Sequence, residues 1–331
     1  MNAHKKTDDE IDRVQRHLAA FYIIAQRSIT KKLKAFAATL KEADALYDNI
    51  GKAKTEAEKR SAESAYRLFF AKLTKTPEYK ELSKSVADEM ASVNQQAAKY
   101  INDNTPAVYA MNYNAVGQGL QKDLNGYFFQ PVTTAEAAQY GNVQKQTVDA
   151  KADKAWNAKT LVKSVIAGAV VGKAVDVIFG DTVRRIISNN RSSANRQASD
   201  MMTSAENLGR IDSMWRANDE GWQVKKRWVA TLDNRTRDTH ILYDGYDPEP
   251  LDFEYSDGLK QPLDPDCSDL GEICNCRCRI TYDFGFNRNA NRAAREGEVT
   301  GSYWNDRSFS GTSTVRVDQM TYEEWQRWRS R

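Results

Sequence analysis

The feature that most constrains the fold is a stripe of apolar residues that recurs at steps of three and four near the start of the chain. Its members are Ile11, Val14, Leu18, Phe21, Ala25, Ile29, Leu33, Phe36 and Leu40. This spacing places apolar side chains on one face of an α-helix. Thr7 and Glu10 have the spacing of a capping box at its start, and Gly51 is suited to end it. The stripe therefore predicts one long amphipathic helix.

Two more helices are expected to follow. Thr55 and Glu58 form a second capping pair, and Pro77 is expected to end the helix that they begin. A third stripe runs from Tyr79 to Ile101, with a predicted stop at Asn104 and Pro106. Residues 1–130 are therefore predicted to form a long-helix bundle or arm, and a seam between chains is the alternative use of such stripes.

Residues 131–220 are predicted to be a helical middle region. Another helix start is marked by Thr133 and Glu136. The segment from Leu161 to Asn189 is expected to form one or two buried helices, broken near Gly180, and its most apolar stretch is 161–180. Gly168 and Gly172 would let two helices pack closely. Charged residues interrupt this stretch, which is too short without them to span a membrane.

The pattern changes near Gly221, and residues 221–331 are predicted to form a small α+β domain. Two β-rich runs, 227–232 and 277–282, predict strands. Between them, residues 235–243 can form a short helix capped by Asp233, and an acidic, proline-containing loop follows. Residues 301–317 are expected to be a short β or loop region, and Thr321 is expected to begin a last helix. The predicted fold class is thus a mainly α N-terminal helical region followed by a small α+β C-terminal domain.

Composition is that of an ordinary globular protein, with 40% hydrophobic and 28% charged residues among 331. The net charge of +3 is too small to indicate nucleic-acid binding by itself. Basic residues nevertheless gather at two places, where they form either solvated faces or contacts to phosphate or an acidic partner. These candidate contacts are Arg184, Arg185, Lys225, Lys226 and Arg227.

All four cysteines lie in one short window, which raises the question of a metal site. Together with a histidine they form the candidate ligand set for a structural zinc: His240, Cys267, Cys274, Cys276 and Cys278. His240 and Asp244 share a helix face, so the carboxylate could orient the imidazole. Cys276 and Cys278 would point to one side of a strand. The alternatives are thiols packed as small hydrophobic side chains and a disulfide formed only in a mature particle.

Several short motifs occur in one order in the C-terminal part. WVATLDNRTRDTH at 228–240 is followed by Asp-Gly at 244–245 and by Asn-Cys-Arg-Cys at 275–278. These motifs resemble those of the phage Mu F-like minor head protein family. Ser204-Ala205-Glu206 stands where that family often has Arg-Thr-Glu, and Tyr322-Glu323-Glu324-Trp325 resembles its closing helix. The residues that carry the resemblance are Trp228, Asp233, Arg235, Thr236, Arg237, His240, Asp244, Gly245, Asn275 and Arg277.

The resemblance, which covers residues 200–331, implies a minor structural protein of a tailed bacteriophage that acts in head morphogenesis near the portal. It implies a place in the virion head, and in the host cytoplasm during assembly. The implied partners are the portal protein and the major capsid or scaffold proteins, with non-specific contact to packaged DNA. No membrane, small-molecule substrate, catalytic residue or cofactor other than a structural zinc is expected.

The alternative function is a metal-dependent or toxin-like enzyme carried in the phage head. A hydrolase could use His240 and Asp244, although no HExxH-type signature is present. Glu296-Gly297-Glu298 and Thr312-Ser313-Thr314 superficially match an ADP-ribosyltransferase, but in that class the Ser/Thr strand comes first. These matches are interpreted as chance, and a non-enzyme is expected.

Arg235 and Arg237 have two interpretations. They could bind a phosphate or carboxylate on the portal. Alternatively, they could pair with Asp233, Asp238 or the acidic loop and hold that loop on the domain. The second interpretation is favoured because the loop is rich in carboxylates. Trp228 is expected to anchor the core.

Overall fold

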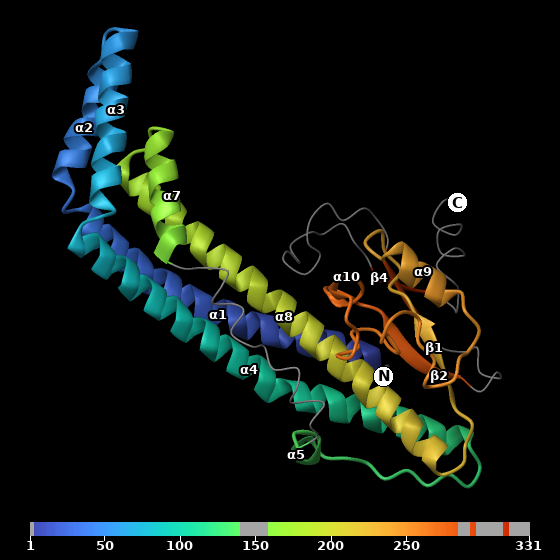
Figure 1. Cartoon of the computed structure of the whole chain (residues 1–331). Coiled ribbons are helices and arrows are strands. Elements are labelled where there is room, and N and C mark those ends of the chain that lie inside the picture. The colour runs from blue at the N-terminus through green and yellow to red at the C-terminus, as the bar shows by residue number, and fades with distance from the viewer. Residues whose placement is uncertain (1–2, 140–157, 284–291, 296–313, 318–331) are drawn as a thin grey trace. The chain divides into compact units, whose positions relative to one another are not determined.

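The computed structural model describes residues 3–139, 158–283, 292–295 and 314–317. Long helices come first and short strands follow, which confirms the predicted fold class (Figure 1). The helices of the first part are α1 (Ala3–Ala37), α2 (Lys41–Lys52), α3 (Glu56–Leu73), α4 (Pro77–Asp123), α5 (Thr134–Ala137), α7 (Ala158–Val170) and α8 (Val175–Asp219). The later elements are β1 (Lys225–Val229), α9 (Asp238–Asp244), α10 (Leu270–Ile273), β2 (Arg279–Asp283), β3 (Arg292–Arg295) and β4 (Thr314–Val317).

Contacts between residues group the chain into two compact units. Unit 1 comprises Met1–Gln15, Ile101–Val148 and Asn195–Arg331, and unit 2 comprises Arg16–Tyr100 and Asp149–Ala194. The long helices α1, α4 and α8 each contribute residues to both units. The boundaries of the units therefore differ from those of the three predicted ranges, 1–130, 131–220 and 221–331. The division into three domains stays a prediction.

The first helix ends earlier than predicted. Helix α1 stops at Ala37, where the Thr39 hydroxyl donates to the Phe36 carbonyl at 2.7 Å, and α2 begins at Lys41, well before Gly51. The predicted stripe is nevertheless largely the buried face, with Tyr22 buried where Phe21 was expected. The capping box of Thr55 at the start of α3 is confirmed.

Two prolines were assigned the wrong role. Pro77 is the first residue of α4, a position where the missing N–H costs no helical hydrogen bond. Pro106 lies inside the same helix, which continues to Asp123. Ile101 and Val108 are buried on either side of it. Tertiary packing of this face therefore outweighs the local cost of the proline.

The break between α7 and α8 lies at Gly172, and Gly180 lies within α8. Gly172 has φ +67°, and the next amide, that of Lys173, donates to the Gly168 carbonyl at 3.1 Å. This left-handed glycine ends α7 as glycines commonly end helices. A Cβ added to Gly168 would lie 2.8 Å from the Ile178 side chain, so this glycine does allow close packing of the two helices.

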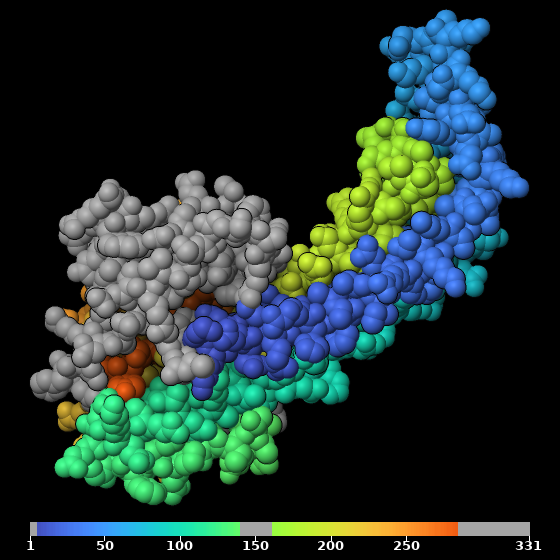
Figure 2. Space-filling view, turned by 180° about the vertical axis from the view of Figure 1, so that it is seen from behind, coloured from blue at the N-terminus to red at the C-terminus, as the bar shows by residue number. Residues whose placement is uncertain are grey.

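Unit 2 consists of helices packed through apolar faces, a few neutral polar contacts and the Lys32–Glu89 ion pair between α1 and α4. Helices α2 and α3 form a hairpin, and α7 lies against α3 (Figure 1 and Figure 2). The Tyr66 hydroxyl donates to the Lys173 carbonyl at 2.7 Å. Deeper in the unit, the Tyr22 hydroxyl donates to Asn94 at 2.8 Å, and the Asn94 amide donates to Asn190 at 2.9 Å.

Unit 1 places a small antiparallel sheet against the C-terminal part of α8. This sheet has two strands, β1 and β2, with Trp228 opposite Ile280. Strands β3 and β4 form a second, separate antiparallel pair. The α4 and α8 backbones approach so closely that a Cβ at Gly209 would lie 2.5 Å from the Tyr109 carbonyl oxygen. This contact requires glycine at position 209.

The elements of unit 1 are shorter than predicted. Strands β1 and β2 begin and end within three residues of the expected runs, and α9 begins only at Asp238. Arg237 precedes it, so Asp233 does not cap this helix. Strand β4 falls within the expected β region at 301–317, while the helix expected from Thr321 lies outside the described residues. Among the helices that the structure describes, none is both long and apolar enough to cross a bilayer.

Candidate functional site

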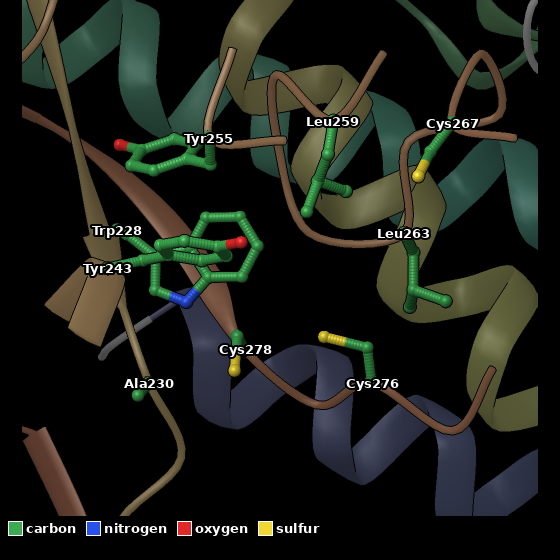
Figure 3. Close-up of a cluster of buried hydrophobic side chains, with 9 residues drawn as sticks. All are labelled: Trp228, Ala230, Tyr243, Tyr255, Leu259, Leu263, Cys267, Cys276 and Cys278. Atoms are coloured by element: carbon green, nitrogen blue, oxygen red, sulfur yellow. The ribbon is translucent and has the colours of Figure 1, made fainter. Parts of the chain in front are cut away.

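The motif at 228–245 surrounds a core of aromatic rings in unit 1. Trp228 of β1 is buried, and its ring lies edge-on to those of His240, Tyr243 and Tyr255, with centroid separations of 4.9, 5.2 and 4.9 Å. Figure 3 shows Trp228, Tyr243 and Tyr255 together with Leu259 and the buried cysteines. Trp228 thus links the strand to α9 and to the loop between α9 and β2.

His240 lies on α9 with a different group at each ring nitrogen. Its Nδ1 lies 3.6 Å from the Cys276 sulfur and 3.5 Å from the Cys278 sulfur. Its Nε2 lies 2.9 Å from a carboxylate oxygen of Glu272, which also accepts the Thr239 hydroxyl. The ring is therefore held between a pair of thiols and a carboxylate.

A turn before β2 brings the two cysteines to this histidine. Asn275 has φ +58°, a left-handed conformation that asparagine tolerates better than most residues. The Cys276 amide donates to the Ile273 carbonyl at 3.1 Å, and Arg237 donates to the Cys274 carbonyl. The thiols therefore converge because of a turn, and the prediction that both lie on the strand is wrong.

The five predicted metal ligands separate into two sets. His240, Cys276 and Cys278 are buried, and their ligand atoms all lie within 4.8 Å of one another. Cys274 is exposed. Cys267 is buried, but its thiol lies 3.7 Å from the Asp269 carbonyl, and Figure 3 shows it beyond Leu263. The structure brings neither of these cysteines to the histidine.

The two converging thiols have pKa values shifted in opposite directions. Burial raises the pKa of the Cys276 thiol well above its ordinary value. Burial acts in the same sense on Cys278, but interactions with the Cys276 and His240 side chains outweigh it and hold the Cys278 pKa below its ordinary value. The two thiols therefore differ, and Cys278 is the more easily deprotonated of the two.

A buried ion pair fixes the turn between β1 and α9. Arg277 donates two hydrogen bonds to the Asp233 carboxylate, one of them at 2.9 Å. The same carboxylate accepts the Arg235 amide at 2.9 Å, and Thr236 donates to the Thr231 carbonyl. The charged motif residues Asp233 and Arg277 thus bind each other within the domain.

Asp244 has a backbone role. Its carboxylate accepts the Ala230 amide at 2.9 Å, which ties the end of α9 to the residue after β1, and Gly245 follows at the end of the helix. The carboxylate that the structure places on the imidazole of His240 is that of Glu272. Sequence reasoning missed Glu272 because it is one of many acidic residues in the loop.

Glu206 joins α8 to β2 through two buried arginines. Its carboxylate pairs with Arg279 at 2.6 Å and with Arg210 at 2.8 Å, and Glu206 itself is fully buried. Next to it, the Asn207 side chain accepts the Ile280 amide at 2.9 Å and donates to the Cys278 carbonyl at 3.2 Å. The segment that begins with Ser204-Ala205-Glu206 therefore fixes β2 to α8.

The predicted basic contacts differ in accessibility. The expectation that Lys226 contacts DNA or a partner is wrong, because its side chain is buried and donates to the carbonyls of Leu251, Phe253 and Lys260 at 2.5–2.8 Å. Arg227 is half-buried and pairs with Asp283. The remaining three are exposed: Arg184, which pairs with Asp181, together with Arg185 and Lys225.

Arg235 is exposed and Arg237 is half-buried. The contact from Arg237 to the Cys274 carbonyl does hold the end of the acidic loop, through a backbone oxygen. The matches considered for an ADP-ribosyltransferase, at 296–298 and 312–313, lie outside the described residues.

Comparison with known proteins gives one match. A family model described as phage Mu protein F like protein matches residues 159–281. The match extends from α7 to β2 and so includes Glu206, the motif around His240 and both converging cysteines. It begins before the region of resemblance noted in the sequence and ends before Tyr322. No curated protein and no solved structure matches the chain.

Proposed function

We propose that this chain, which belongs to the phage Mu F-like family over residues 159–281, is a minor structural protein of a tailed-bacteriophage head, bound near the portal. The family suggests a role in phage head morphogenesis. The finer assignment, to a minor component that contacts the portal and the capsid or scaffold proteins, is our proposal. Its locations are the host cytoplasm during assembly and then the virion.

The main support for this proposal is that the polar residues of the motif bind other groups inside the domain. Asp233 binds Arg277, Asp244 binds a backbone amide, and Glu206 binds two arginines. In an enzyme, such groups would be expected to face a cavity where a substrate could reach them. Here they hold short strands and loops in place, which favours a scaffold whose outer surface binds other proteins.

Contact with packaged DNA is a lesser part of the proposal. Arg185 and Lys225 are exposed and could contribute non-specific phosphate contacts. Such contacts would weaken steeply as salt concentration rises. Lys226 cannot contribute, because its ammonium group is bound inside the loop.

The test is to fractionate assembling heads and finished particles and to quantify the chain by mass spectrometry. The expected result is a few to tens of copies per particle in the parent, and loss of the chain from heads that assemble without the portal. Absence from both fractions in the parent would overturn the proposal. Retention at full copy number without the portal would overturn the portal contact and leave a capsid component.

A further inference from the structure

We propose that His240, Cys276 and Cys278 bind a structural zinc ion through Nδ1 and the two sulfurs, with Glu272 orienting the imidazole. This inference concerns the folded chain itself and does not depend on its role in a phage head.

The spacing of the three ligand atoms fits zinc. Zinc–sulfur bonds of about 2.3 Å and zinc–nitrogen bonds of about 2.0–2.1 Å at tetrahedral angles put sulfur and nitrogen about 3.6 Å apart. The two sulfur–Nδ1 distances are 3.6 and 3.5 Å. The imidazole nitrogen therefore lies at a zinc-like distance from both sulfurs, and all three ligand atoms lie within 4.8 Å of one another.

The second nitrogen of the imidazole is held as metal-bound histidines usually are. Glu272 lies 2.9 Å from Nε2, so it favours a proton on Nε2 and leaves the Nδ1 lone pair directed at the sulfurs. Thr239 donates to the same carboxylate and helps to hold it. A histidine packed only as a core side chain would not require this orientation.

Charge also favours an ion at this position. On binding, both thiols release their protons to solvent, and two thiolates with one divalent cation sum to zero charge. A neutral complex is the form that a buried site accommodates at least cost. Trp228, in the same cluster, has a buried ring N–H with no hydrogen-bond partner among the described atoms, and a metal-bound sulfur nearby would be a good acceptor for it.

The ion would join parts of unit 1 that are far apart in sequence. His240 belongs to α9, whereas the cysteines belong to the turn that leads into β2. Among the described His, Cys, Asp and Glu side chains these three form the ligand group, so water is the expected fourth ligand. Three protein ligands with a water are the usual set of a catalytic zinc, but the burial of all three ligands here favours a structural ion.

The first experiment uses the full chain, purified without an affinity tag and without chelator. Elemental analysis should find about one zinc per chain. Exchange for cobalt(II) should produce sulfur-to-cobalt charge transfer and the visible bands of a tetrahedral site. X-ray absorption on the zinc form should give two sulfur and two nitrogen or oxygen neighbours.

Variants then test the ligands. Cys276→Ser and His240→Ala should each lose most of the zinc, whereas Cys274→Ser and Cys267→Ser should keep it, because those cysteines lie outside the group. Glu272→Gln preserves the shape of the side chain and tests orientation without removing a ligand. It should weaken zinc affinity by about 10–100-fold.

Several results would overturn the proposal. One is less than about a tenth of an equivalent of zinc in the parent with no charge-transfer band after cobalt addition. Another is equal loss of metal in the Cys274→Ser control. A third is a Cys276–Cys278 disulfide in the purified parent, detected as blocked alkylation with an intact mass lower by two hydrogens. None of these readouts requires a phage particle, so failure here is distinct from failure of the proposed function.

Discussion

The two units bury polar groups in different ways. In unit 2 the buried polar contacts among Tyr22, Asn94 and Asn190 join neutral side chains. In unit 1 the buried contacts also include charged groups, as in Glu206 with its two arginines. The difference follows from secondary structure, because helices satisfy their own backbone groups and short loops do not.

Unit 1 contains a long loop between α9 and β2 whose carbonyl groups need donors. Lys226 donates to three of them, and Asn207 donates to the carbonyls of Pro262 and Cys278. Polar side chains from β1 and α8 thus satisfy backbone carbonyls of this loop that would be paired by backbone hydrogen bonds in a sheet. The comparison predicts that single polar substitutions will cost more in unit 1 than in unit 2.

The largest effect is expected for Glu206→Gln. The substitution keeps the shape of the side chain but removes the carboxylate that pairs with Arg210 and Arg279, and Arg279 keeps only the longer contact to Asp8 at 3.4 Å. Breaking a buried ion pair on one side costs about 3–5 kcal/mol. Urea unfolding followed by tryptophan fluorescence should show a fall in the free energy of unfolding of this size.

The matched control is Glu63→Gln in α3. Glu63 pairs with Arg67 at 3.3 Å in the same i,i+4 relation that Glu206 has to Arg210, but both side chains are substantially exposed. Its loss should cost less than about 1 kcal/mol. If the two substitutions had equal effects, burial would not explain the importance of Glu206.

A smaller effect is expected for Asn94→Leu in unit 2. The leucine would leave the Tyr22 hydroxyl and the Asn190 side-chain oxygen without their present partner, at a cost of about 1–3 kcal/mol. The same unfolding measurement applies. Adding Tyr22→Phe removes one stranded donor, so the double variant should recover part of the loss. A loss larger than that of Glu206→Gln would contradict the contrast between neutral and charged contacts.

Sequence reasoning succeeded where periodicity or a local cap decides the structure. The apolar stripe from Ile11 and the caps at Thr55 and Thr133 are examples. The predicted helix stop at Pro106 was wrong, because packing on both sides of the proline outweighs its local cost to the helix. The predicted helix break near Gly180 was wrong because Gly172, earlier in the chain, supplies the left-handed residue that ends α7.

The candidate site was only partly readable for a related reason. The residue types at His240, Cys276 and Cys278 were apparent, but their convergence depends on the turn at Asn275. Glu272 had no distinguishing mark within an acidic loop. Lys226 looked like part of a basic surface because nothing local indicates that a lysine is buried under a loop from elsewhere in the chain.

The smallest effect is expected for Asp200→Asn, and it should depend on pH. Burial raises the pKa of Asp200 to about 7, although Arg196 and Arg237 favour its charged form. The ordinary pKa in an unfolded chain is about 3.9. Between these values the folded state holds more protons than the unfolded state, so the free energy of unfolding of the parent should fall as pH rises from about 4 to 7.

Asparagine keeps an oxygen for the Asn275 amide, which Asp200 accepts at 3.3 Å, and carries no charge. The variant should therefore match the parent near pH 4 and exceed it at pH 8 by about 1 kcal/mol, a value reduced from the full shift because the side chain is partly exposed. Urea unfolding at both pH values measures the difference. Identical profiles for parent and variant would show that burying the charged Asp200 carboxylate has no free-energy cost. The need of buried charges in unit 1 for a partner of opposite charge would then apply only to sites such as Glu206.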